Sequence, residues 1–279
     1  SFLYNITKKE NKVWFRFAYL FFTLLIILSE IYVINFFVLK QKAKQERNLL
    51  NTIQIEEYEV PKNQIEKIVQ ETVGEIIKKK KERILKVKKL QEENEDIIGW
   101  LEIEGTDINY PVLQGKDDEY YMTHNYKKEY SRNGSIFLSK DYNWDIPSNN
   151  LLIYGHNLNN GTMFQELLKY KDEEFYKEHS IIRFTTAFED VKFEIISVFQ
   201  SRVYYKSEKN VFRYYYFVNP ETEEEYNEFV ESAKRVSLYE IEATANYGDS
   251  LITLSTCSYH VKDGRFAVVG KKINKEANR

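Results

Sequence analysis

Cys257 is the only cysteine among the 279 residues of the chain, and it ends the apolar run "SLITLSTC". A position where a buried strand passes into a polar loop is where protein scaffolds often present reactive side chains. A thiol that attacks a carbonyl group needs a partner that converts it to a thiolate and a donor that stabilises the oxyanion formed. A single cysteine is otherwise explained as a small buried apolar residue, so the chemistry depends on finding these partners.

Four histidines are candidate bases for such a thiol. His156 ends a second apolar run, "NNLLIYGHN", so the ends of two strands of one sheet would bring it close to Cys257. His260 is the rival, because it follows Cys257 by three residues, but a base is usually held by a different rigid element from the nucleophile. His124 lies in a polar loop, and we expect it to be solvated; His179 lies in a helical, charged stretch, and we expect it at the surface.

Arg265 begins the run "GRFAVVGKK" shortly after Cys257. A guanidinium at that place would donate fixed hydrogen bonds to a developing oxyanion. The alternative is an ordinary charge at a strand edge. The chain has no His-Glu-x-x-His motif and no glycine-rich phosphate loop, so we expect no metal and no cofactor.

The elements that must position these residues are short strands. After Gly99, nine short apolar or alternating runs are separated by turn residues, a pattern that predicts a closed or nearly closed β-barrel within a catalytic domain of residues 96–279. Helical patterns interrupt the strands at residues 162–179 and 220–236. An amphipathic helical extension is predicted for residues 61–95, and its "KKKKERILKVKK" run is interpreted as a solvated helix face.

The apolar segment 17–39 predicts a transmembrane helix, preceded by a short tail of residues 1–16 and followed by a polar linker of residues 40–60. Glu30 costs about 3 kcal/mol there, which the surrounding apolar residues outweigh. Basic residues flank both ends equally, so the orientation depends on the chemistry of the domain. A net charge of −3 gives no electrostatic signature of nucleic-acid binding.

Together, these motifs resemble those of class B sortases, the membrane-anchored cysteine transpeptidases of Gram-positive bacteria. The resemblance rests on "TLSTC", the arginine of "GRFAVV", and "LLIYGHN" with "GTMFQEL" upstream. It extends from about Gly99 to Ile273 and includes "INYPVLQGKDDEYY" and "NGSIFLSKDYN". It implies a mainly β, closed sortase barrel with an N-terminal helix and inserted helices. It also implies a single-pass membrane protein with a cytoplasmic N-terminus and an extracellular catalytic domain.

The same resemblance implies the role of each site residue. Cys257 would be the nucleophile, His156 the acid and base, and Arg265 the group that stabilises the substrate carbonyl and the oxyanion. Substrate-groove positions would be Ser255, Thr256 and Met122, together with Ser207, Val211 and Phe212 of the loop "KSEKNVFR". One position departs from some class B members, which carry a carboxylate two residues after the nucleophile, where this chain has Tyr259.

The reaction implied by the family is cleavage of a C-terminal sorting signal of a surface protein. A thioester forms on the cysteine, and an amine from a peptidoglycan stem peptide or a pilin subunit then resolves it. Two alternatives remain open from the sequence. A papain-like thiol hydrolase would need the cysteine before the histidine in the chain. A non-catalytic membrane-anchored adhesion or binding barrel would have the same architecture, with an unreactive Cys257.

Overall fold

The computed structural model describes residues 62–144 and 150–273, with side chains described from residue 70 onward. Residues 69–279 form one compact unit and residues 1–68 form another. The fold described below is that of residues 69–279.

Several sequence-based predictions lie outside the described residues: the tail 1–16, the transmembrane helix 17–39 with Glu30, and the linker 40–60. Within the described ranges, none of the helices combines the length and the apolar character needed to cross a membrane.

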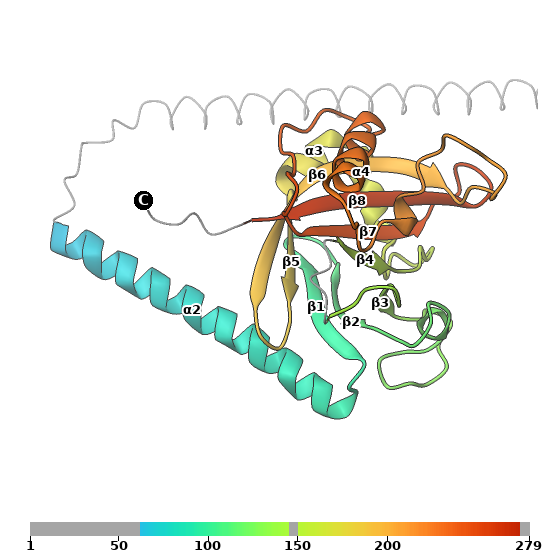
Figure 1. The fold of residues 1–279 in the computed structure, drawn as a ribbon. Coiled ribbons are helices and arrows are strands. Elements are labelled where there is room, and N and C mark those ends of the chain that lie inside the picture. The colour runs from blue at the N-terminus through green and yellow to red at the C-terminus, as the bar shows by residue number, and fades with distance from the viewer. Residues whose placement is uncertain (1–61, 145–149, 274–279) are drawn as a thin grey trace, which may run out of the picture. The chain divides into compact units, whose positions relative to one another are not determined.

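Eight strands of the described residues form a closed barrel in the order β1-β2-β3-β4-β7-β8-β6-β5 (Figure 1). Most neighbours are antiparallel, but β2 with β3 and β4 with β7 are parallel pairs. The strands are β1 (Ile97–Ile103), β2 (Asn109–Leu113), β3 (Ile136–Leu138), β4 (Asn150–Tyr154), β5 (Ile181–Thr185), β6 (Asp190–Arg202), β7 (Leu251–Cys257) and β8 (Gly264–Lys272). The prediction of a mainly β, closed barrel is therefore confirmed.

The helices precede the barrel or lie in its connections. They are α2 (Lys62–Glu93), η1 (Tyr120–Met122), η2 (Gln165–Lys171), α3 (Glu173–Glu178), η3 (Tyr214–Tyr216) and α4 (Glu223–Arg235), where η denotes a 3-10 helix. The helix α4 begins at the cap residue Thr222, whose side chain accepts a hydrogen bond from the backbone N–H of Glu225. Such a cap satisfies a donor that the first helical turn leaves unpaired.

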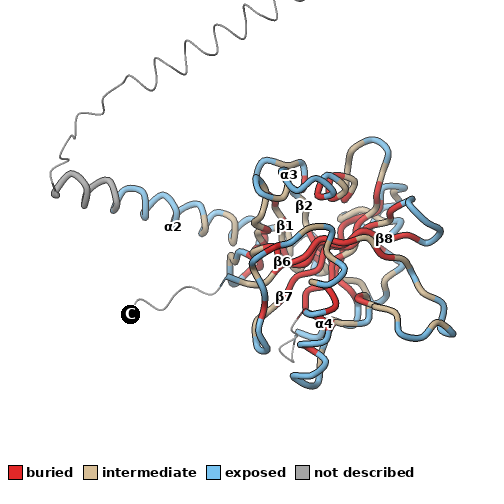
Figure 2. Tube along the Cα trace, turned by 90° about the horizontal axis from the view of Figure 1, so that it is seen from above, coloured by how far each residue is buried: buried red, intermediate tan, exposed pale blue. Residues whose placement is uncertain are grey.

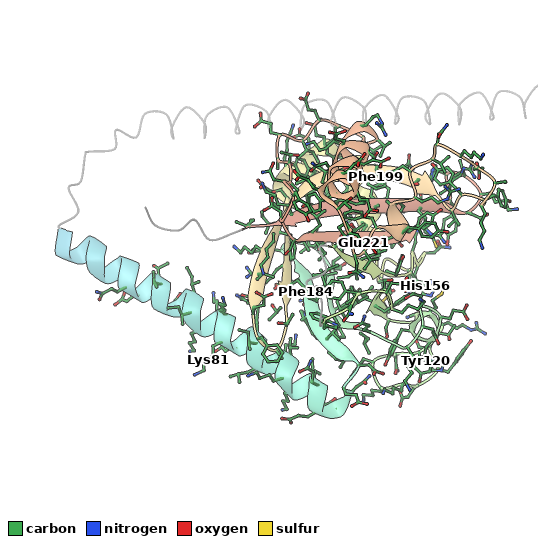
Figure 3. All side chains as sticks on the ribbon, viewed as in Figure 1. Lys81, Tyr120, His156, Phe184, Phe199 and Glu221 are labelled. Atoms are coloured by element: carbon green, nitrogen blue, oxygen red, sulfur yellow. The ribbon has the colours of Figure 1, made fainter. Side chains whose placement is uncertain are left out.

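The core consists of two main apolar clusters on opposite faces of the sheet. Along β8, Phe266 and Val268 belong to the cluster inside the barrel, whereas Ala267 and Val269 belong to a second cluster beneath α4. This separation follows from the alternation of side chains along a strand. Figure 2 shows the buried residues along β6, β7 and β8, and Figure 3 labels Phe184 of the first cluster and Phe199 of the second.

One of the nine predicted strand runs is not a strand. The segment "VFRYYYFV", residues 211–218, forms the short helix η3 and the loops beside it. Most of its aromatic residues pack into the second cluster, whereas Tyr216 is exposed. Tyr214 is buried, and Phe217 stacks on Phe229 of α4 with ring centroids 3.9 Å apart. Aromatic enrichment alone therefore does not distinguish a strand from a loop that covers a sheet.

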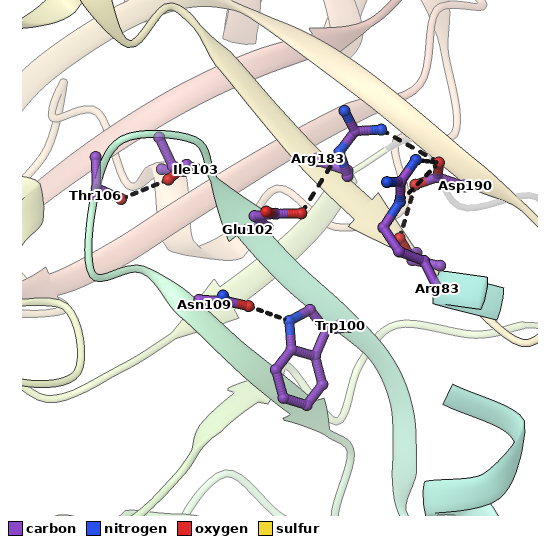
Figure 4. Close-up of polar contacts among 9 residues, drawn as sticks. Arg83, Trp100, Glu102, Ile103, Thr106, Asn109, Arg183 and Asp190 are labelled. Carbon is purple, nitrogen blue, oxygen red and sulfur yellow. Dashed lines mark hydrogen bonds and ion pairs between the residues drawn. The ribbon is translucent and has the colours of Figure 1, made fainter. Parts of the chain in front are cut away.

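The C-terminal half of α2 packs on the barrel through a buried carboxylate (Figure 4). The side chain of Asp190 is only 4% exposed, and one of its oxygens lies 2.6 Å from Arg83 of α2 and 3.2 Å from Arg183 of β5. Thr185 donates a hydrogen bond of 2.7 Å to the other oxygen. Burial by itself raises the pKa of Asp190, but the hydrogen bonds from Arg83 and Thr185 and the charge of Arg183 outweigh it and hold the pKa below its usual value.

We expect Asp190→Ala to lower the free energy of unfolding by about 3 kcal/mol, the lower end of the range for breaking a buried ion pair, because both arginines stay partly hydrated. The folded-state pKa of Asp190 is depressed, so its contribution is present above the unfolded pKa of about 4 and is lost as the pH falls through the folded pKa. Denaturant unfolding of the full chain at several pH values measures both effects. The control is Glu189→Ala, which removes the exposed pair with Lys272 and should cost less than about 1 kcal/mol.

Candidate active site

Cys257, His156 and Arg265 come together because three paired strands end at the same edge of the barrel. Cys257 is the last residue of β7 and lies opposite Arg265 of β8 in the antiparallel register. The parallel pair of β4 with β7 runs as far as Tyr154 opposite Ser255, and His156 follows two residues later. Figure 3 labels His156 beside these strands.

The side chains of Cys257 and Arg265 share one face of the sheet, and β4 leads to His156 from the same face. Leu152 of β4 and Ala267 of β8 belong to the cluster on the outer face of the barrel. Because side chains two residues apart point to the same face, the alternation carries that face to Tyr154 at the end of β4 and to Arg265 along β8. Cys257 follows in the same way from Leu251 of β7, which belongs to the same cluster. The register thus places Cys257 and Arg265 on the outer face at the strand ends, and His156, two residues beyond β4, lines the same cavity.

These residues line a single cavity of about 230 Å³. Cys257 is half-buried there, as a free thiol. The predicted groove residues Met122, Ser255 and Thr256 line the same cavity. Its remaining lining residues were not singled out by the sequence analysis: Asp118, Phe137, Tyr154 and Gly155.

The imidazole of His156 is oriented by a backbone carbonyl. Its Nε2 lies 2.7 Å from the carbonyl oxygen of Met122 in η1. A carbonyl oxygen only accepts hydrogen bonds, so Nε2 carries the proton in the neutral ring, and Nδ1 is the nitrogen that can take up another. A histidine oriented in this way can act as a base through Nδ1 and then, once protonated, as an acid.

The hydroxyl groups of Ser255 and Thr256 are already bonded within the protein. The Ser255 hydroxyl lies 2.7 Å from the phenol oxygen of Tyr214. Thr256 donates a hydrogen bond of 2.7 Å to the carbonyl oxygen of Gly155. Both residues are almost completely buried. They therefore shape the wall of the cavity and fix the strand that carries Cys257.

The electrostatics of the cavity combine one guanidinium with neutral phenols. Arg265 is half-buried, and one of its nitrogens donates to the carbonyl oxygen of Gly264 at 3.0 Å. Burial raises the pKa of Tyr154 and of Tyr214 although Arg265 lies close enough to oppose it, so both phenols are neutral at physiological pH. Burial also raises the pKa of Asp118, against the hydrogen bond that its carboxylate accepts from the backbone N–H of Lys140.

The other three predicted groove residues do not line the cavity of Cys257. Ser207 is exposed in the loop after β6. Val211 and Phe212 line a different and larger cavity of about 800 Å³ against α4. The ring of Phe212 packs against Phe199 and Phe229, at 5.6 Å from each. The loop thus directs Phe212 into the outer cluster.

The other histidines are placed away from the cavity lining. His260 is exposed, with its Nδ1 2.9 Å from the Ser258 hydroxyl. His124 is half-buried, contrary to the expectation that it is solvated, and His179, expected at the surface, is half-buried as well. His124 stacks on Tyr120, and the Nδ1 of His179 lies 2.9 Å from the carbonyl oxygen of Glu104. Each therefore has a structural role that a polar sequence context did not reveal.

Tyr154 is the missed lining residue that the sequence signals most clearly. It stands two residues before His156 in "LLIYGHN", so the strand alternation places it on the same face. Asp118 lies in the loop after β2, and Phe137 comes from β3. Their approach to Cys257 depends on the closure of the barrel, which local patterns do not encode.

Comparison with known proteins agrees with this fold. The family model described as "Sortase domain" matches residues 101–273, so the chain belongs to the sortase family. Sortase B of Listeria monocytogenes is 36% identical over 192 residues, which cover 67% of this chain and 73% of that protein. Sortase B of Staphylococcus aureus is 32% identical over 186 residues, which cover 66% of this chain and 73% of that protein.

Solved structures of sortase B are similar as well. A Staphylococcus aureus sortase B–substrate complex superposes with a TM-score of 0.61 at 28% identity, covering 75% of this chain and 94% of that one. A sortase B complexed with triglycine gives a TM-score of 0.60 at 31% identity, covering 67% and 85%. The class within the family is therefore B, and the chain is a cysteine transpeptidase. The thiol hydrolase and the adhesion barrel are not favoured.

Proposed function

We propose that Cys257, His156 and Arg265 carry out the transpeptidation at the cavity of this chain. One observation supports the assignment most directly: the three side chains line a single cavity at the shared ends of β4, β7 and β8. A nucleophile, a proton carrier and a cation with fixed hydrogen-bond donors are the groups that acyl transfer through a thiol requires.

In the proposed reaction, the Cys257 thiolate attacks the carbonyl carbon of the scissile peptide bond in a C-terminal sorting signal. Arg265 donates hydrogen bonds to the oxyanion that develops. His156 gives its proton to the leaving amine as the C–N bond breaks, which leaves a thioester on Cys257. An incoming amine then attacks the thioester, His156 accepts the proton of that amine, and a new amide bond forms as the Cys257 thiolate leaves.

The proposed substrates are surface proteins with a sorting signal, and the proposed acceptor is an amine of a peptidoglycan stem peptide or a pilin subunit. The substrate complex and the triglycine complex of similar sortase B structures support these two classes of ligand. The cavity offers Met122, Phe137 and Tyr154 for apolar contact with a peptide. No metal or cofactor takes part in the proposed steps.

We further propose that residues 17–39 anchor the chain in the cell membrane by a single pass, with the N-terminus cytoplasmic and residues 96–279 extracellular. The length and the apolar character of that segment support the anchor. The absence of a second cysteine leaves Cys257 no disulfide partner within its own chain, so no intrachain disulfide can occupy its thiol in an oxidising environment.

A panel of sorting-signal peptides incubated with the full chain tests the proposed function. Mass spectrometry should detect a thioester on Cys257 with one class of peptide, and an added amine such as triglycine should convert it to an amide product. Cleavage without any transfer to amines would instead indicate a thiol hydrolase. If no peptide forms an adduct while a small alkylating reagent labels Cys257, the proposed substrate class is wrong.

Arg265→Lys should lower the rate of cleavage by about 10²- to 10³-fold, the usual cost of losing one oxyanion donor. A lysine keeps the positive charge, but a single ammonium group cannot reproduce the planar set of donors of a guanidinium. Single-turnover rates of thioester formation measure the effect. Arg213→Lys is the matched control, because Arg213 binds the backbone carbonyls of Tyr205 and Glu208 away from the cavity. Full activity of the Arg265 variant would mean that only the charge matters.

A further inference from the structure

Two side-chain hydrogen bonds join the segment that carries His156 to the strand that carries Cys257. The strand β4 ends at Tyr154, and the last backbone bond between the two segments runs from the N–H of Gly155 to the carbonyl of Ser255. Beyond it, Thr256 donates to the carbonyl of Gly155 at 2.7 Å. Asn157 then donates its side-chain N–H to the carbonyl oxygen of Cys257 at 2.9 Å.

The amide of Asn157 is held in place for this contact. The residue is 7% exposed, and its backbone forms an isolated β-bridge with Met163. Next to this bridge in the sequence, the backbone N–H of Phe164 donates a hydrogen bond of 2.8 Å to the carbonyl oxygen of His156. The segment is also pressed against the core at Gly155, where a Cβ would lie 2.4 Å from Ile136 and 2.7 Å from Phe164. The polypeptide on either side of His156 therefore has little freedom to shift.

We propose that Asn157 is a positioning residue, which sets the geometry between the Cys257 thiol and the His156 imidazole through its hydrogen bond to the Cys257 carbonyl. Cys257 is the end of β7, and the backbone ladder with β4 has already stopped two residues before it. The Asn157 amide replaces the missing strand partner and fixes the peptide plane that follows the nucleophile. Proton transfer depends on distances of about 3 Å between the reacting groups, so a small displacement of the strand end would matter.

This inference rests on the proposed roles of Cys257 and His156, but it makes a separate prediction. Asn157→Ala should lower kcat by about 10- to 100-fold, because a misplacement of about 1 Å costs up to that much. KM should change by less than about twofold, since Asn157 does not line the cavity. The measurement uses the full chain with the best peptide of the panel, and circular dichroism checks that the barrel is folded.

Asn150→Ala is the matched control. Asn150 starts the same β4–β7 pair at its opposite end, is completely buried, and donates its side-chain amide to the carbonyl of Phe217 at 2.7 Å. This variant should lose stability without a loss of kcat for the folded fraction. If it lowers kcat as much as Asn157→Ala does, the effect reflects general loosening of the strand pair, and the positioning role is wrong.

Asn157→Asp gives a signature that a merely structural role would not produce. A carboxylate has nearly the shape of the amide but cannot donate to the Cys257 carbonyl, whereas the protonated acid can. Relative to the unaltered protein, kcat of this variant should therefore rise as the pH is lowered and the carboxyl group takes up a proton. A relative kcat that stays flat or falls towards low pH overturns the inference, as does an Asn157→Ala variant with unchanged kcat. Loss of activity in Cys257→Ala within the same assay shows that the proposed function itself stands.

Discussion

Cys257→Ala is expected to abolish both cleavage of sorting-signal peptides and transfer to amines. The substitution removes the attacking sulfur, and His156 and Arg265 cannot form a thioester without it. The fold should be retained, because Cys257 is half-buried at the end of β7 and contributes to neither main core cluster. Peptide cleavage, amine transfer and circular dichroism measure the three outcomes.

An alkylation experiment strengthens this test. Cys257 is the only cysteine of the chain, so a thiol reagent that adds once to the unaltered protein reports on this residue alone. Pretreatment with the reagent should abolish activity to the same extent as Cys257→Ala. Cleavage near the original rate in either the alkylated protein or the variant would disprove the thiol mechanism.

His156→Ala should also eliminate turnover, whereas His260→Ala should lower the rate by less than about threefold, within the range of an exposed substitution. The difference follows from placement. His156 lines the cavity and is oriented by the Met122 carbonyl, while His260 is exposed and lies against the Ser258 hydroxyl. A general acid must be held within hydrogen-bond reach of the leaving amine.

Rates of cleavage and of amine transfer for both variants, between about pH 5 and 8, where an imidazole titrates, provide the measurement. Alkylation of Cys257 in each variant is the control for access to the thiol. An inactive His260→Ala together with an active His156→Ala would reverse the assignment of the base, and the interpretation of the cavity would have to change with it.

The sequence predicts the barrel and the approach of the three main site residues for a simple reason. Cys257, His156 and Arg265 each stand at the end of an apolar run, and strand ends meet when the strands pair. Cys257 lies two residues after Ser255, and His156 lies two residues after Tyr154. Because side chains two residues apart along a strand share a face, the pairing of Ser255 with Tyr154 predicts that the segments carrying Cys257 and His156 approach from the same face. These predictions hold because the geometry of a strand is nearly the same in every barrel.

The loops are predicted less well, because their conformation depends on what they cover. Val211 and Phe212 are expected to line the substrate groove, but the structure places them on the larger cavity against α4 and not on the cavity of Cys257. Tyr214, three residues after Val211, is the residue of this loop that reaches the strand of Cys257, through Ser255. Which of several neighbouring aromatic side chains turns inward is decided by packing against partners that are remote in sequence.

The bond between His156 and the Met122 carbonyl makes the active site sensitive to a residue outside it. Gly134 has a φ of 59°, and a Cβ at that position would lie 2.5 Å from the same Met122 oxygen. A side chain there would force the carbonyl to turn away and would deprive the imidazole of its acceptor. The missing Cβ of Gly134 thus leaves room for the Met122 carbonyl oxygen that contacts the Nε2 of His156.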